Sequence, residues 1–108
     1  MGRPITLEWK AAQADEGRVD VSVTIDGTEQ QVGSLDAVTE TDLGTPATCA
    51  LRAAHPLRSE FQCGAGNFYA AELHAGELVI TLDDGEHTVE VKRFPVEGEG
   101  LAVRPYAL

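Results

Sequence analysis

The stretch NFYAAELHAGELVITLDDGEHTVEVKRFP, residues 67–95, is the clearest indication of the fold class of this chain. Apolar and polar residues alternate along it, and the pairs Ala75-Gly76 and Asp84-Gly85 interrupt the alternation. Alternation with period two is typical of a strand with one buried face, and such pairs are typical of tight turns. The stretch therefore predicts a three-stranded antiparallel meander.

Two-residue turns at these positions fix which residues of neighbouring strands lie opposite each other. Across the first turn the expected pairs are Tyr69–Leu82, Ala71–Ile80 and Leu73–Leu78. Across the second they are Leu78–Val91 and Ile80–Val89. All are apolar, so one face of the meander is predicted to be buried. The outward face should be mostly polar, with a small apolar patch formed by Phe68, Val79 and Phe94.

The N-terminal third shows the same alternation. Ile5, Leu7 and Trp9 share one face of the first segment, and residues 19–25 alternate again up to the turn signal Asp26-Gly27. A returning strand over residues 29–35 would place Val32 opposite Val21. These segments predict three further strands with one buried face.

A second hairpin is predicted around His55-Pro56, between residues 47–54 and 57–63. Folding about Pro56 pairs Cys49 with Cys63, Leu51 with Phe61, Ala53 with Ser59, and Arg52 with Glu60. Directly opposed cysteines come within disulfide range if the pair is of the non-hydrogen-bonded kind. A Cys49–Cys63 disulfide is therefore possible, and two buried free thiols are the alternative.

The remaining segments complete the expected architecture. Residues 36–46 lack alternation and are interpreted as a loop, and residues 101–103 predict a short edge strand before Pro105. The whole chain of 108 residues has the size of one domain. We expect a single all-β domain, an antiparallel β-sandwich of about eight or nine short strands, with a partly closed β-barrel as the alternative.

The net charge narrows the class of partner. Acidic residues outnumber basic ones by 18 to 8, so the formal net charge is −10. Such a charge repels nucleic acids and anionic membrane surfaces, and it suits a cationic protein partner or a divalent cation. The apolar runs are too short to cross a bilayer, and the N-terminus lacks a secretory pattern. A cytoplasmic location is favoured, or a secreted or periplasmic one if the cysteines are bridged.

The candidate site is a set of carboxylates in alternate connections. If every connection reverses the chain, alternate connections emerge at the same end of the domain. One end would then gather Asp15, Glu16, Asp36, Glu40, Asp42, Asp83, Asp84 and Glu86. The other end would hold Asp26, His55, Arg58, His74 and Glu77. Carboxylates from separate loops could bind a basic protein surface or Ca²⁺, although aspartates beside glycine also serve simply to form turns.

Catalytic motifs are missing from the sequence. The three histidines follow no zinc pattern, the acidic loops do not match EF-hand spacing, and no nucleophile elbow occurs. We therefore expect a non-catalytic binding domain whose acidic end contacts a cationic protein partner, as an inhibitor, immunity-type or assembly component. The alternative is a module that binds Ca²⁺ or a small ligand, without another cofactor. A small carboxylate-dependent hydrolase is the third possibility.

Overall fold

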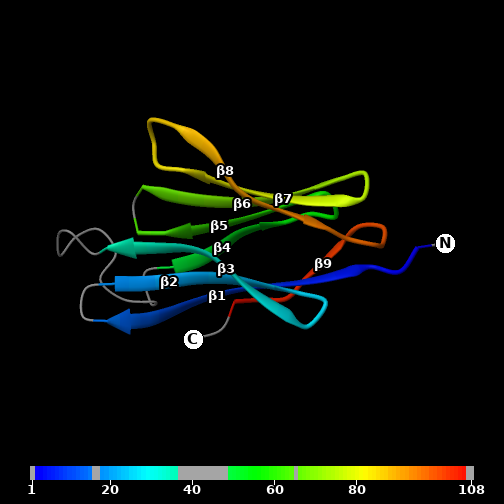
Figure 1. Ribbon diagram of the computed structural model, residues 1–108, viewed down its shortest axis with the longest axis horizontal. Coiled ribbons are helices and arrows are strands. Elements are labelled where there is room, and N and C mark those ends of the chain that lie inside the picture. The colour runs from blue at the N-terminus through cyan, green and yellow to red at the C-terminus, as the bar shows by residue number, and fades with distance from the viewer. Residues whose placement is uncertain (1, 16–17, 37–48, 65, 107–108) are drawn as a thin grey trace.

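The computed structural model describes residues 2–15, 18–36, 49–64 and 66–106. This part of the chain forms two packed sheets of strands (Figure 1). The four-stranded sheet has the order β3-β2-β1-β9, and its strands are β1 (Ile5–Asp15), β2 (Arg18–Ile25), β3 (Thr28–Asp36) and β9 (Leu101–Val103). The five-stranded sheet has the order β4-β5-β6-β7-β8, and its strands are β4 (Cys49–Ala54), β5 (Arg58–Cys63), β6 (Asn67–His74), β7 (Glu77–Asp83) and β8 (Thr88–Pro95). Both sheets are open, so the predicted sandwich is confirmed in preference to the barrel.

The core lies between the sheets and has an aromatic centre. The indole of Trp9 stacks on Phe61 with ring centroids 5.3 Å apart, and both side chains are fully buried. The Trp9 indole N–H donates a hydrogen bond of 2.9 Å to the Ser59 hydroxyl, which donates in turn to the carbonyl of Ala53. These two hydrogen bonds satisfy the buried polar atoms of Trp9 and Ser59, so neither group is left unpaired between the sheets.

The first predicted turn of the meander is confirmed and the second is wrong. All three pairs expected between β6 and β7 are present. Between β7 and β8, however, Val89 lies opposite Leu82, Lys92 opposite Ile80, and Phe94 opposite Leu78, so the expected pairs Ile80–Val89 and Leu78–Val91 do not form.

Two local features explain the shift between β7 and β8. The carboxylate of Asp84 accepts hydrogen bonds from the amides of Glu86 and His87, which extends the connection to four residues. A bulge opposite Ile80 and Thr81 then advances β8 by one more residue. As a result Phe94 packs against the core and not in the expected outward patch, while Val89 is 51% exposed.

The hairpin of β2 and β3 has the predicted turn but a different register beyond it. Asp26 and Gly27 both have positive φ angles, 49° and 87°, as this tight turn requires. A bulge after Ser22 then places Gly33, not Val32, opposite Val21. The bulge places Gly33 against the buried Tyr69 of β6. A Cβ at position 33 would lie 2.0 Å from the Tyr69 hydroxyl, so a larger residue could not fit there without moving the tyrosine.

The hairpin of β4 and β5 also contains a bulge. The pairs Cys49–Cys63 and Leu51–Phe61 form as predicted, but Ala53 lies opposite Glu60 and Ala54 opposite Ser59. The expected pairs Ala53–Ser59 and Arg52–Glu60 are therefore wrong. The guanidinium of Arg52 donates instead to the side-chain carbonyl of Gln62 at 2.9 Å.

The short predicted edge strand is confirmed as β9, which runs parallel to β1. Its Leu101 amide donates to the carbonyl of Pro56, so it also joins the β4–β5 turn of the other sheet. Beyond it the ring of Tyr106 meets Phe61 edge-on at 4.9 Å. The last part of the chain thus covers one open side of the sandwich. Within the described residues, the structure contains no helix of the length and apolar character needed to cross a membrane.

Candidate binding surfaces

The strands β1, β3, β5 and β7 all end at the same end of the molecule (Figure 1, left). We call this the acidic end. The sequence segments that connect these strands to the next ones, residues 15–18, 36–48, 64–66 and 83–87, hold eight acidic residues and one basic residue, which is −7 of the net charge of −10. In the four-stranded sheet, Arg18 is the register partner of both Asp15 and Asp36. The side chains of Asp15 and Asp36, and all of Glu16, Glu40 and Asp42, lie outside the described part of the chain.

Two of the three described carboxylates at the acidic end, those of Asp83 and Asp84, bind backbone amides. Asp83 accepts a hydrogen bond of 2.8 Å from the amide of Gly85. Asp84 accepts from the amides of His87 and Glu86 at 2.8 and 2.9 Å, and these two bonds lower the pKa of its carboxyl group. Both aspartates therefore form the turn. Because an amide donor carries no net charge, each carboxylate keeps its negative charge while it does so.

Carboxylates at the opposite end are bound to arginines, and we call this the paired end. Arg3 contacts Asp26 at 3.0 Å, and Arg93 contacts Glu77 and Glu90 at 2.8 and 2.7 Å. Arg58 likewise binds two carboxylates, those of Glu60 and Glu72. The hydrogen bond from Arg3 is the main reason why the pKa of Asp26 is lowered. These contacts neutralise charge, so the paired end presents a weaker negative field than the acidic end.

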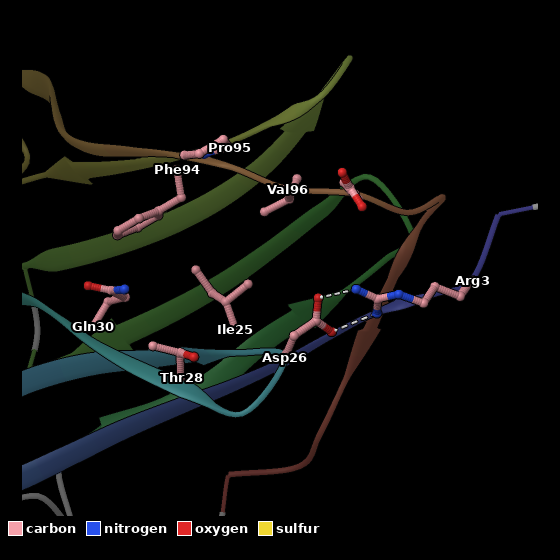
Figure 2. Close-up of a pocket in the computed structure, with 9 residues that line it drawn as sticks. Arg3, Ile25, Asp26, Thr28, Gln30, Phe94, Pro95 and Val96 are labelled. Carbon is pink, nitrogen blue, oxygen red and sulfur yellow. Dashed lines mark hydrogen bonds and ion pairs between the residues drawn. The ribbon is translucent and has the colours of Figure 1, made fainter.

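A groove of about 680 Å³ opens at the paired end, between the edge strands of the two sheets. Figure 2 shows Phe94 and Val96 on one side and Ile25 with Gln30 on the other, while the Arg3–Asp26 ion pair lies at one end. The sequence prediction missed this groove because it placed Phe94 on the outward face. Only the bulge in β8 turns that ring toward the gap between the sheets.

A disulfide links Cys49 and Cys63, whose Cα atoms are 4.0 Å apart. Both residues are buried and join the start of β4 to the end of β5. The bond lies at the acidic end, since β5 ends there (Figure 1). The bridged alternative of the sequence prediction is the one found, and it links the start of β4 to the end of β5.

Metal ligation finds no support in the residues that the structure describes. Among the side chains that the structure describes, which do not include those of Asp15 and Asp36, no three His, Cys, Asp or Glu residues converge on a common point. His74 lies 3.4 Å from the carboxylate of Glu72, which is an ordinary surface contact. The described carboxylates therefore supply no ligand set for Ca²⁺, which takes about six to eight oxygens.

Comparison with protein-family models, with curated proteins and with solved structures found no match to this chain. The function must therefore be inferred from the surfaces described above.

Proposed function

We propose that this protein is a non-catalytic binding domain that contacts a cationic protein surface with its acidic end, as an inhibitor, immunity-type or assembly component. The observation that carries the proposal is the separation of charge between the two ends. Arginines bind the carboxylates of the paired end, whereas backbone amides bind Asp83 and Asp84.

The physical consequence of this separation is an oriented electric field. By sequence, seven of the ten net negative charges belong to the four segments that connect β1, β3, β5 and β7 to the strands that follow them. A field concentrated on one end steers a cationic partner into one orientation and raises the rate of association at low ionic strength. The same interaction weakens as salt screens the charges.

Local rigidity favours the same function. The disulfide fixes β4 to β5, and the amide bonds of Asp84 hold the β7–β8 connection in one conformation. An ordered β7–β8 connection loses less conformational entropy when it binds, so more of its interaction energy appears as affinity.

The test is capture of a partner by the immobilised protein at low and at high ionic strength, with identification by mass spectrometry. The key variant carries Asp83→Asn, Asp84→Asn and Glu86→Gln. Asparagine keeps the oxygen that accepts the amide hydrogen bonds, so the turn is retained while three charges are removed. The matched control carries Glu8→Gln, Glu97→Gln and Glu99→Gln, which removes equal charge elsewhere.

The expected partner is retained at low salt by the wild type and by the control, and is lost from the key variant. Retention that does not respond to salt, or that is equal in the two triple variants, would overturn the proposal.

The groove at the paired end favours a second candidate, a module that binds a small ligand. Its volume lies within the range of about 300–1,000 Å³ that is usual for ligand pockets. Ile25 on one side and Phe94 and Val96 on the other give it apolar walls. The variant Thr28→Trp would fill it. Small apolar compounds that raise the melting temperature of the wild type but not of this variant would support the candidate, and an absence of such compounds from a broad screen would count against it.

A further inference from the structure

The outer face of the five-stranded sheet contains a hollow of about 250 Å³ beside the acidic end. Its floor is Ala70, which is only 4% exposed although it lies on the face turned away from the core. Phe68, two residues earlier on β6, stands beside it with 41% of its surface exposed. Ala70 thus leaves a gap among larger neighbours, and an aromatic ring forms one wall of that gap.

Carboxylates from two neighbouring strands also line the hollow. Glu60 of β5 is the register partner of Ala70, and Asp83 of β7 is the register partner of Phe68. One oxygen of Asp83 accepts the Gly85 amide, and its other oxygen has no hydrogen-bond partner within the described residues. Arg58 lines the far side, but its guanidinium is bound by both Glu60 and Glu72. The charge of that arginine is therefore offset, and the hollow remains acidic at the Asp83 side.

We infer that this hollow receives an arginine side chain of the partner protein, an inference that rests on the proposed function. The guanidinium would lie against the face of Phe68 and donate hydrogen bonds to the free oxygen of Asp83. Arginine fits better than lysine, because its planar fork both stacks on aromatic rings and pairs with carboxylates. The volume is below the range of about 300–1,000 Å³ for small-molecule pockets, so it suits one side chain and not a whole ligand.

The experiment follows backbone amide chemical shifts by NMR while short peptides are added to the full chain. The probes are acetyl-Gly-Arg-Gly-amide, the same peptide with lysine, and the same peptide with citrulline, which has the shape of arginine but no charge. The arginine peptide should shift the amides of Ala70 and Thr81, the lysine peptide should do so more weakly, and the citrulline peptide should leave them unchanged.

Three variants test the individual contacts. Ala70→Leu fills the hollow without changing charge and should abolish binding of the arginine peptide. Phe68→Ala should lower the affinity about two- to fivefold, as expected for loss of an exposed cation–π contact. The control is Val89→Ala, which removes exposed apolar surface outside the hollow and should change nothing. Binding that persists in Ala70→Leu, or that is equal for arginine and citrulline peptides, would overturn the inference.

The hollow and the proposed function can fail separately. If partner capture is lost in the acidic-end triple variant but unchanged in Ala70→Leu, the hollow is excluded and the proposed function stands. If the arginine peptide binds in the hollow but partner capture does not respond to salt, the hollow stands and the proposed function is excluded.

Discussion

The described carboxylates at the two ends of the sandwich accept hydrogen bonds from different kinds of donor. At the paired end, Asp26 is bound by Arg3 and Glu77 by Arg93, so each contact removes a charge from the surface. At the acidic end, Asp84 is bound by amides, so its charge remains. A carboxylate can therefore stabilise a turn and keep its charge available to a partner, provided that its hydrogen-bond donors are neutral.

The ends also differ in what stabilises them. A disulfide lies at the acidic end, and the Tyr69 ring packs closely on Gly33 in the neighbouring core. The paired end depends more on exposed ion pairs, which salt and acid weaken. Reductant and packing mutations should therefore affect the acidic end most, and salt should affect the paired end most.

The largest expected effect is that of reducing Cys49–Cys63. Loss of a cross-link over a sequence separation of 14 residues should lower the free energy of unfolding by about 2–4 kcal/mol. Urea unfolding followed by Trp9 fluorescence, with and without reductant, measures the change. The variant Cys49→Ala/Cys63→Ala should be less stable than the oxidised protein and indifferent to reductant. Equal stability in all these conditions would show that the acidic end does not depend on its cross-link.

Raising the pH toward 12 should lower the free energy of unfolding almost as much, because the buried Tyr69 phenol then ionises. Burial raises the pKa of its phenol to about 12, from an ordinary value near 10. Because the folded pKa is the higher one, the stabilisation is complete below pH 10 and is lost as the pH rises toward about 12, by about 2–3 kcal/mol. Urea unfolding at stepwise pH measures the loss. The variant Tyr69→Phe should lack most of it, leaving the smaller contribution of Tyr106, whose pKa is also raised by burial.

Substitution at Gly33 tests the packing of the two sheets near the acidic end. A Cβ there would lie 2.0 Å from the Tyr69 hydroxyl, so Gly33→Ala should destabilise the protein by about 1–3 kcal/mol. Tyr69→Phe alone should be neutral or stabilising, because the buried hydroxyl has no hydrogen-bond partner in the described residues. The double variant should recover part of the loss in thermal melts. Additive effects would show that the two residues do not meet.

The smallest effects compare one aspartate from each end. Asp26→Asn should lower the melting temperature more at low than at high salt, because it breaks the ion pair with Arg3. Asp84→Asn should lower the melting temperature less than Asp84→Ala at every ionic strength, since asparagine keeps the oxygen that accepts the amide hydrogen bonds but loses the charge that strengthens them. A salt-dependent effect at Asp84 would contradict the distinction between the two ends.

Acid provides a related check on the same two residues. The pKa values of Asp26 and Asp84 both lie below the ordinary value of 3.8. A lowered pKa stabilises the fold above the unfolded value, and that stabilisation disappears as the pH falls below about 4 through the folded values. Melts at decreasing pH should show this loss in the wild type and less of it in the Asp26→Asn/Asp84→Asn variant.

The amino-acid pattern was enough to predict an all-β domain with buried strand faces, because alternation from Ile5 to Trp9 and from Val19 to Val23 requires an apolar layer to cover those faces. The choice of an open sandwich over a partly closed barrel came from the structure. The predicted pairing of Cys49 with Cys63 also forms, although the pairs next to the turn are shifted by one residue and the bulge at Arg52 restores the predicted register before the cysteines. For the candidate carboxylates, the order of strands and connections predicts at which end of the domain they should lie. It does not predict which groups donate hydrogen bonds to them.

The positions of the bulges, at which a strand shifts by one residue relative to its neighbour, are known only from the tertiary structure. The bulges beside Gly33 and Arg52 and in β8 respond to contacts between segments far apart in sequence, such as Tyr69 against Gly33. A slip of one residue exchanges the two faces of a strand, so the bulge in β8 moved Phe94 from the predicted outer patch to the groove. Local alternation carries no information about such long-range contacts, which is why both the groove and the hollow above Ala70 emerge only from the packed fold.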